Sequence, residues 1–133
     1  MFVRPAKEED SENFKEWAKN TPSLDPTIFR LPETYTLCAY NEKGVTAFLP
    51  VQEPKIASTQ MLESLVINPE ATDKEIAAAL RELVRGVILV THMKQADEIY
   101  FVGDHPETNK IAERIFTKVE YPVYRLRLKD LEG

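Results

Sequence analysis

The feature that most constrains the fold is one long amphipathic stretch in the second half of the chain. It begins at Thr72 or Asp73, and its apolar residues recur at three- and four-residue steps, which is the spacing of one helix face. These residues are Ile76, Leu80, Leu83, Val84, Val87 and Ile88. Gly86 lies inside the pattern, and because glycine weakens a helix interior, it indicates a bend or a close contact with a neighbouring element. The stretch therefore predicts a long helix with one buried face.

Segments rich in β-forming residues and two shorter helical patterns define the order of the other elements. A strand over Met1–Ala6 precedes a helix that Asp10 or Ser11 can cap and that Trp17 anchors in the core. The other predicted strands are Thr34–Tyr40, Val45–Val51, Gln60–Ile67, Glu98–Val102 and Val123–Leu128, and a third helix begins at Pro106. The fold class is therefore α+β, in the order β-α-β-β-β-α-β-α-β, with an irregular connection over residues 21–32.

Turn residues and the single cysteine add detail to this pattern. Asn41-Glu42-Lys43-Gly44 is typical of a hairpin turn, so we expect the strands on either side of it to pair. Pro50 and Pro54 mark a strand end or a bulge, because proline has no N–H to donate to a β-ladder. Cys38 lies inside a predicted strand, where a small buried hydrophobic side chain is expected rather than a nucleophile.

Length and charge argue against several classes of protein. The chain has 133 residues, which suits a single domain over residues 1–133. Its formal net charge of −5 argues against nucleic-acid binding through phosphate neutralisation. The longest aliphatic run, Val87–Val90, is far shorter than the ~20 apolar residues of a membrane span, and a lone cysteine forms no internal disulfide. We therefore expect a cytoplasmic protein that binds neither nucleic acid nor membrane.

Four segments of the chain resemble the GNAT superfamily of N-acetyltransferases. The opening Val3-Arg4-Pro5-Ala6 and the acids and helix after it are similar to the family's N-terminal strand and helix. Residues 60–70, QMLESLVINPE, resemble its central strand and the turn that leaves it. Asn109, Ala112 and Val119-Glu120-Tyr121 fall at the spacing of its C-terminal motif. The resemblance covers nearly the whole chain and implies a central mixed, mostly antiparallel sheet flanked by helices.

The resemblance also implies a site for acetyl-CoA at the start of the long helix. In the family, free amides at this helix N-terminus hold the pyrophosphate, and the helix dipole favours its negative charge. The corresponding cofactor-binding positions here are Ile67, Thr72, Lys74, Glu75, Ile76, Ala77 and Asn109. Acetyl transfer to an amine then needs an oxyanion donor, a base for the ammonium proton and an acid for the leaving thiolate.

The loop at this site departs from the family pattern. The family's Arg or Gln is Thr72 here, and its glycine positions carry Asp73 and Glu75. Two negative charges ~5 Å apart repel by ~3 kcal/mol at an effective dielectric near 20, so these acids disfavour a dianion, although Lys74 offsets part of the repulsion. The same residues also suit an ordinary helix start, with Thr72 or Asp73 as the N-cap and the acids complementing the helix dipole.

Candidate catalytic groups are few. Phe116 occupies the position of the family tyrosine that protonates CoA, and it has no proton to give. Glu63 lies on the central strand where some family members carry a base, but simple alternation along the strand explains it equally well. His105 is interpreted as a surface loop residue. His92, His105 and Cys38 lack the spacing of metal ligands, so we expect no metal site.

Two functions from different classes remain open. In the first, the chain keeps the fold with weak or lost acyl transfer, uses no cofactor and serves as a binding or regulatory module. In the second, it is an acetyl-CoA-dependent N-acetyltransferase that acts on an unidentified amine. The altered loop and the missing tyrosine favour the first. The expected partner is an amine or a protein, and the apolar hairpin of Tyr35–Tyr40 and Val45–Val51 is a candidate surface for a homodimer.

Overall fold

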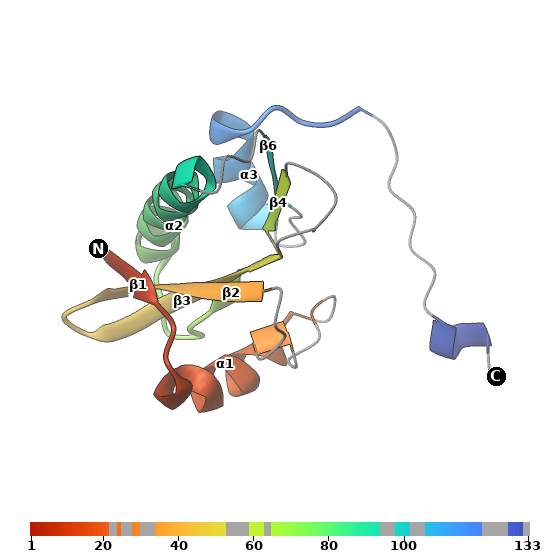
Figure 1. Cartoon of the computed structure of the whole chain (residues 1–133). Helices are drawn as coiled ribbons and strands as arrows, with labels where there is room; N and C mark the ends of the chain where they lie inside the picture. Colours follow the sequence, from red (N-terminus) through yellow and green to blue (C-terminus); the bar gives the residue numbers. More distant parts are fainter. Residues whose placement is uncertain are drawn as a thin grey trace.

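A mixed sheet forms the centre of the fold (Figure 1) in the computed structural model, which describes residues 1–21, 24, 28–29, 34–52, 59–62, 65–93, 98–101, 106–120 and 128–131. Its strands are β1 (Phe2–Pro5), β2 (Thr34–Asn41), β3 (Gly44–Gln52), β4 (Thr59–Leu62), β5 (Val66–Ile67) and β6 (Glu98–Phe101). The strand order is β1-β2-β3-β4-β6, and β5 pairs with β3. All of these pairs are antiparallel except β4 with β6, which is parallel. The predicted mixed, mostly antiparallel sheet is therefore confirmed.

Helices cover both faces of this sheet. The short helix η1 (Glu8–Asp10) leads into α1 (Ser11–Ala18), which lies on one face, whereas α2 (Asp73–Met93) and α3 (Pro106–Ile115) lie on the other (Figure 1). Alternate residues of β2 and β3 point to opposite faces, so Leu37 packs in the core under α2 while its neighbour Cys38 packs in the core under α1. Each face therefore has its own hydrophobic core.

The predicted elements occur in the predicted order from the first strand to the third helix. The predicted final strand, Val123–Leu128, falls mostly on residues 121–127, which lie outside the described residues. Leu128 itself begins the short helix η3 (Leu128–Leu131), so the strand prediction is wrong at that residue.

The predicted strand Gln60–Ile67 is divided into two in the structure. β4 pairs with the end of β3, where Val51 lies opposite Leu62, whereas β5 pairs farther back, where Phe48 lies opposite Val66. The register shifts by one residue between these two pairings, and residues 63 and 64, which connect β4 towards β5, lie outside the described residues. Pro50 lies in the stretch of β3 between them, and it has no N–H for a ladder. Pro50 therefore lies inside β3 and does not end it, and Pro54 lies outside the described residues.

The β2–β3 hairpin lies inside the sheet, with other strands paired on both of its sides. β1 pairs with the outer side of β2, and β4 and β5 pair with the outer side of β3. The turn reverses through Gly44, whose φ of 118° favours glycine. The hairpin as a surface that pairs across a two-fold axis stays a prediction, and β1, β4 and β5 pair along part of its two edges.

The long helix α2 runs close to the sheet at Gly86. A Cβ atom at this position would lie 3.2 Å from Leu37 Cδ1 and 3.3 Å from Val3 Cγ1. The glycine therefore lets the helix approach β1 and β2, which confirms the predicted close contact. No helix among the described residues combines the length and apolar character that crossing a membrane requires.

Candidate functional site

The N-terminus of α2 is closed by a reciprocal pair of hydrogen bonds between Thr72 and Glu75. The Glu75 N–H donates to Thr72 Oγ1 at 3.2 Å, and the Thr72 N–H donates to Glu75 Oε1 at 2.9 Å. This arrangement is a capping box, in which a threonine N-cap and a glutamate three residues later satisfy each other's backbone donors. The Ile76 N–H donates to the Thr72 carbonyl at 2.9 Å, so the first turn is also regular.

The Glu75 carboxylate also connects the start of α2 to the turn of the β2–β3 hairpin. Asn41 Nδ2 donates to Glu75 Oε2 at 3.1 Å, and Lys43 Nζ lies 3.7 Å from the same oxygen. Asn41 Oδ1 in turn accepts the Lys43 N–H at 2.9 Å, which orders the turn. These hydrogen bonds, chiefly from the Thr72 N–H and the Asn41 amide, lower the pKa of Glu75 below its ordinary value. Glu75 is therefore an anion at neutral pH that occupies the start of α2.

Replacing Thr72 by alanine tests whether the capping box stabilises the helix. Thr72→Ala removes the hydroxyl that accepts the Glu75 N–H, so we expect the free energy of unfolding to fall by about 1 kcal/mol. Urea denaturation measures this change. Thr72→Ser keeps the hydroxyl and serves as the control. Equal losses of unfolding free energy in the two variants would mean that the hydroxyl at this position does not stabilise the helix.

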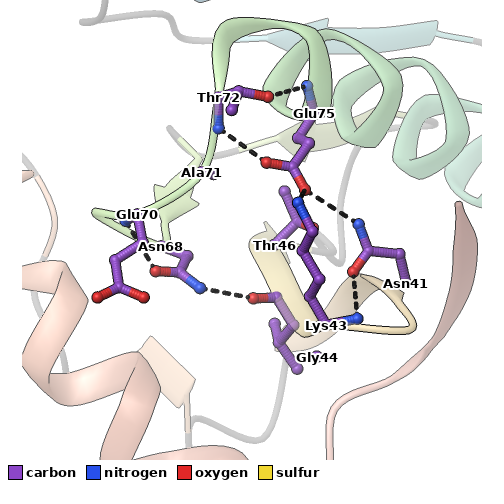
Figure 2. Close-up of a pocket in the computed structure, with 10 residues that line it drawn as sticks. Asn41, Lys43, Gly44, Thr46, Asn68, Glu70, Ala71, Thr72 and Glu75 are labelled. Carbon is purple, nitrogen blue, oxygen red and sulfur yellow. Dashed lines mark hydrogen bonds and ion pairs between the residues drawn. The ribbon is translucent and has the colours of Figure 1, made fainter.

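A cavity of about 300 Å³ lies between this helix start and the hairpin (Figure 2). Asn41, Lys43 and Glu75 lie on one side of it, and Asn68 and Glu70 lie on the other. The Asn68 side chain is fixed at both ends, because Nδ2 donates to the Val45 carbonyl at 3.0 Å and Oδ1 accepts the Glu70 N–H at 3.0 Å. Gly44, Val45, Thr46, Ala71 and Thr72 complete the lining.

Solved structures with similar architecture identify the fold. A ribosomal-protein-alanine N-acetyltransferase from Brucella melitensis biovar Abortus 2308 matches with a TM-score of 0.75 and 12% identity, over 96% of this chain and 98% of that one. An aminoglycoside N-acetyltransferase in complex with CoA gives 0.69 and 12%, over 95% and 98%. A transcriptional regulator from Bacillus halodurans C-125 gives 0.72 and 14%, over 96% and 99%. No family model and no curated protein matches the sequence.

The chain has the GNAT fold. In this fold the start of α2 follows the central strand, so the helix N-terminus described above is the one that the resemblance assigned to CoA. The residues present there do not fit a diphosphate well. The amides of Glu75 and Ile76 already donate within the chain, and the Glu75 carboxylate is held at the same helix end. A bound diphosphate would have to displace or repel that carboxylate.

The other residues assigned to the cofactor by resemblance to the GNAT family have mixed environments. Ile67 and Ile76 pack against the core under α2, and they need no ligand to explain them. Lys74 is exposed and Ala77 is half-buried on the first turns of α2. Asn109 is half-buried on α3. The structure therefore brings Thr72 and Glu75 together, and they form hydrogen bonds with each other.

Phe116 is part of the apolar core in this GNAT fold. Its ring stacks on Phe101 of β6, with centroids 5.8 Å apart and an interplanar angle of 14°, and it packs against the core under α2. The side chain therefore has a structural role at the position of the family tyrosine. Glu63, the candidate base, lies outside the described residues.

Sequence reasoning missed the hairpin half of this site. Asn41, Lys43 and Thr46 lie far from α2 in the sequence, and only the pairing of β3 with β5 brings their turn near Thr72 and the helix start. The capping box was readable, because threonine followed three residues later by glutamate is its sequence signature. The contact of Asn41 with Glu75 has no comparable local signal.

Proposed function

We propose that this chain is a GNAT-fold protein with weak or lost acyl transfer that serves as a binding or regulatory module. The observation that carries the proposal is the Glu75 carboxylate, which takes the position at the helix end that an anionic ligand would need. Phe116 supports it further, because the family's usual acid is replaced by a core side chain. A similar fold in a protein described as a transcriptional regulator supports a regulatory role, by analogy of fold alone.

CoA binding tests the proposal directly. Thermal unfolding of the wild type is followed with CoA up to 1 mM, which would be about a hundred times a Kd of ~10 μM and would add ~2.7 kcal/mol of stability. We expect no saturable shift in the midpoint temperature, because the α2 N-terminus already holds an anion. Inorganic phosphate at equal ionic strength controls for salt effects.

A matched pair of variants assigns the effect to Glu75. Glu75→Gln removes the charge, and glutamine can still serve in a capping box, so we expect CoA to bind this variant at least fivefold more tightly than the wild type. Glu42→Gln removes the same charge from an exposed position in the hairpin turn and should leave CoA binding unchanged. Equal gains in both variants would point to net charge rather than to the carboxylate at the helix end.

The alternative function is an active N-acetyltransferase, which the similar structure in complex with CoA supports by analogy. An active enzyme would show a saturable rise in the midpoint temperature of the wild type when CoA is added. It would also release a thiol from acetyl-CoA when amines are added. That result would contradict our proposal and would make an amine the substrate.

A further inference from the structure

β1 is the strand at one end of the sheet (Figure 1), and no described strand pairs with its outer edge. The Ala6 N–H, just after β1, donates to the Thr36 carbonyl at 2.8 Å. Backbone bonding alternates along an antiparallel pair, so the N–H and carbonyl of Arg4 also face β2. The corresponding groups of Val3 and Pro5 therefore face the open side.

This open edge has few hydrogen-bonding groups to offer. Pro5 has no N–H, and its carbonyl already accepts a hydrogen bond from Arg4 Nη1 at 3.1 Å. Val3 is the residue of β1 whose N–H and carbonyl both face outwards with no partner among the described residues. An extended peptide would bind weakly here, because the addition of a strand depends on a row of main-chain hydrogen bonds. A partner for this edge must also bind through side chains.

Exposed apolar side chains lie on both sides of this edge. On the face of the sheet that carries α1, Phe2 is 66% exposed, and its ring lies 5.7 Å from that of Tyr40. On the other face, α2 approaches Val3 at Gly86. Leu89 follows three residues later on the same flank of this helix and is 67% exposed. Large apolar side chains gathered around an edge strand are typical of an interaction surface.

We propose that β1 pairs with β1 of a second copy of this chain, antiparallel and with a two-fold axis at Val3. The two Val3 residues then exchange two hydrogen bonds, and Phe2 of each copy lies directly opposite Arg4 of the other. The Arg4 guanidinium is held by two hydrogen bonds to Asp10 and lies 5.6 Å from the centre of the Tyr40 ring. An arginine also packs favourably on a phenylalanine ring, so this edge is complementary to itself. The proposal does not depend on whether the chain binds CoA.

The proposed interface is small, so we expect a weak dimer. It consists of a short strand pair and a few side chains, and it falls below the area of about 1,200 Å² at which standard interfaces begin. We expect a dissociation constant on the order of 100 μM. Sedimentation velocity should show a monomer at about 1 μM and mostly a dimer at about 1 mM. A monomer over this whole range overturns the proposal.

Amide hydrogen exchange locates the interface. The Val3 N–H should exchange at least twofold more slowly at about 1 mM protein than at about 50 μM, because it is bonded only in the dimer. The Arg4 N–H faces β2 and is the internal control, whose exchange should not depend on concentration. A dimer that leaves the exchange of Val3 unchanged, such as one formed through the turn of the β2–β3 hairpin, contradicts the proposal.

Two substitutions of Phe2 test the register of the strand pair. Phe2→Lys places an ammonium opposite Arg4 of the other copy, so we expect the dimer to weaken at least tenfold. Phe2→Glu places a carboxylate there, and this variant should dimerise at least threefold more tightly than Phe2→Lys. The formal net charge of the chain is −5, so repulsion between whole chains predicts the opposite order. Equal dimerisation of the two variants, or the opposite order, overturns the proposed register.

A substitution on α2 tests the other side of the edge. The two-fold axis at Val3 brings the adjoining flanks of α2 near each other, so Leu89→Ser should weaken the dimer at least threefold. Ile115→Ser is the matched control, because Ile115 is also exposed, at 42%, but lies on α3. Cooperative thermal unfolding shows that each variant is folded. Equal dissociation constants of the two variants would place the interface away from this flank of α2 and overturn the proposal.

Discussion

Phe48→Ala is expected to lower the free energy of unfolding by about 3–5 kcal/mol, which is the range for truncation of a buried phenylalanine. Phe48 is 0% exposed on β3 and joins the sheet to α1. Its ring contacts Phe14 edge-on at 5.6 Å between centroids and Trp17 at 5.6 Å. Alanine would leave a cavity between the sheet and the helix and remove both aromatic contacts.

Urea denaturation followed by fluorescence measures this loss, because Trp17 is the single tryptophan and lies beside Phe48. Phe2→Ala is the control. Phe2 is 66% exposed, and although its ring lies 5.7 Å from Tyr40, we expect its loss to cost less than about 1 kcal/mol. A small effect of Phe48→Ala would mean that α1 packs against the sheet less tightly than the structure indicates.

Asp10→Asn is expected to remove about 2–3 kcal/mol of stability at neutral pH. Asp10 accepts two hydrogen bonds from the Arg4 guanidinium, at 2.8 and 3.1 Å, and one from the Lys7 N–H at 2.7 Å. Its side chain is 7% exposed and that of Arg4 is 26% exposed. Asparagine keeps the shape of the side chain but leaves the partly buried Arg4 cation without its counter-charge. Removing one partner of a buried ion pair destabilises a protein because the other charge stays buried and uncompensated.

This contribution depends on pH in a defined direction. The hydrogen bond from Arg4 and the one from Lys7 hold the pKa of Asp10 below its ordinary value, against the opposing effect of burial. A carboxyl group with a lowered folded-state pKa stabilises the fold above its unfolded pKa of ~3.9 and loses that effect as the pH falls through the folded value. The stability difference between wild type and Asp10→Asn should therefore shrink as the pH is lowered below ~4.

The exposed pair of Lys19 and Glu16 provides the control for this prediction. Its N–O distance of 2.8 Å equals that of Arg4 and Asp10, but its side chains are 66% and 68% exposed. We therefore expect Glu16→Gln to change stability by less than about 0.5 kcal/mol at any pH. Similar effects of Glu16→Gln and Asp10→Asn would show that burial does not strengthen the Arg4 interaction.

Periodic patterns predicted most of the fold from the sequence. The helical spacing from Ile76 to Val87 gave α2, and the turn residues between Asn41 and Gly44 gave the β2–β3 hairpin. These signals are local, because each depends on residues within one or two turns or strands. The division of one predicted strand into β4 and β5 was not foreseen, since it depends on where each of them pairs with β3. Register between strands is set by tertiary packing.

The candidate site was predicted less completely, for a related reason. The sequence pointed to the correct helix start and to the unusual acids at Asp73 and Glu75. The sequence left two interpretations of Glu75 open, as a charge that repels a ligand or as an acid that complements the helix dipole. In the structure its carboxylate accepts hydrogen bonds from the Thr72 N–H and the Asn41 amide. Asn41 is 34 residues from Glu75, so only the folded sheet reveals the contact.

The burial of Cys38 makes the chain's only thiol a reporter of its motions. The residue is 0% exposed on β2, and burial raises the pKa of its thiol to about 11. Only the thiolate reacts quickly with disulfide reagents, so the folded protein should be nearly inert to them near neutral pH. Cys38 faces the core under α1, so its labelling rate measures how often that helix separates from the sheet.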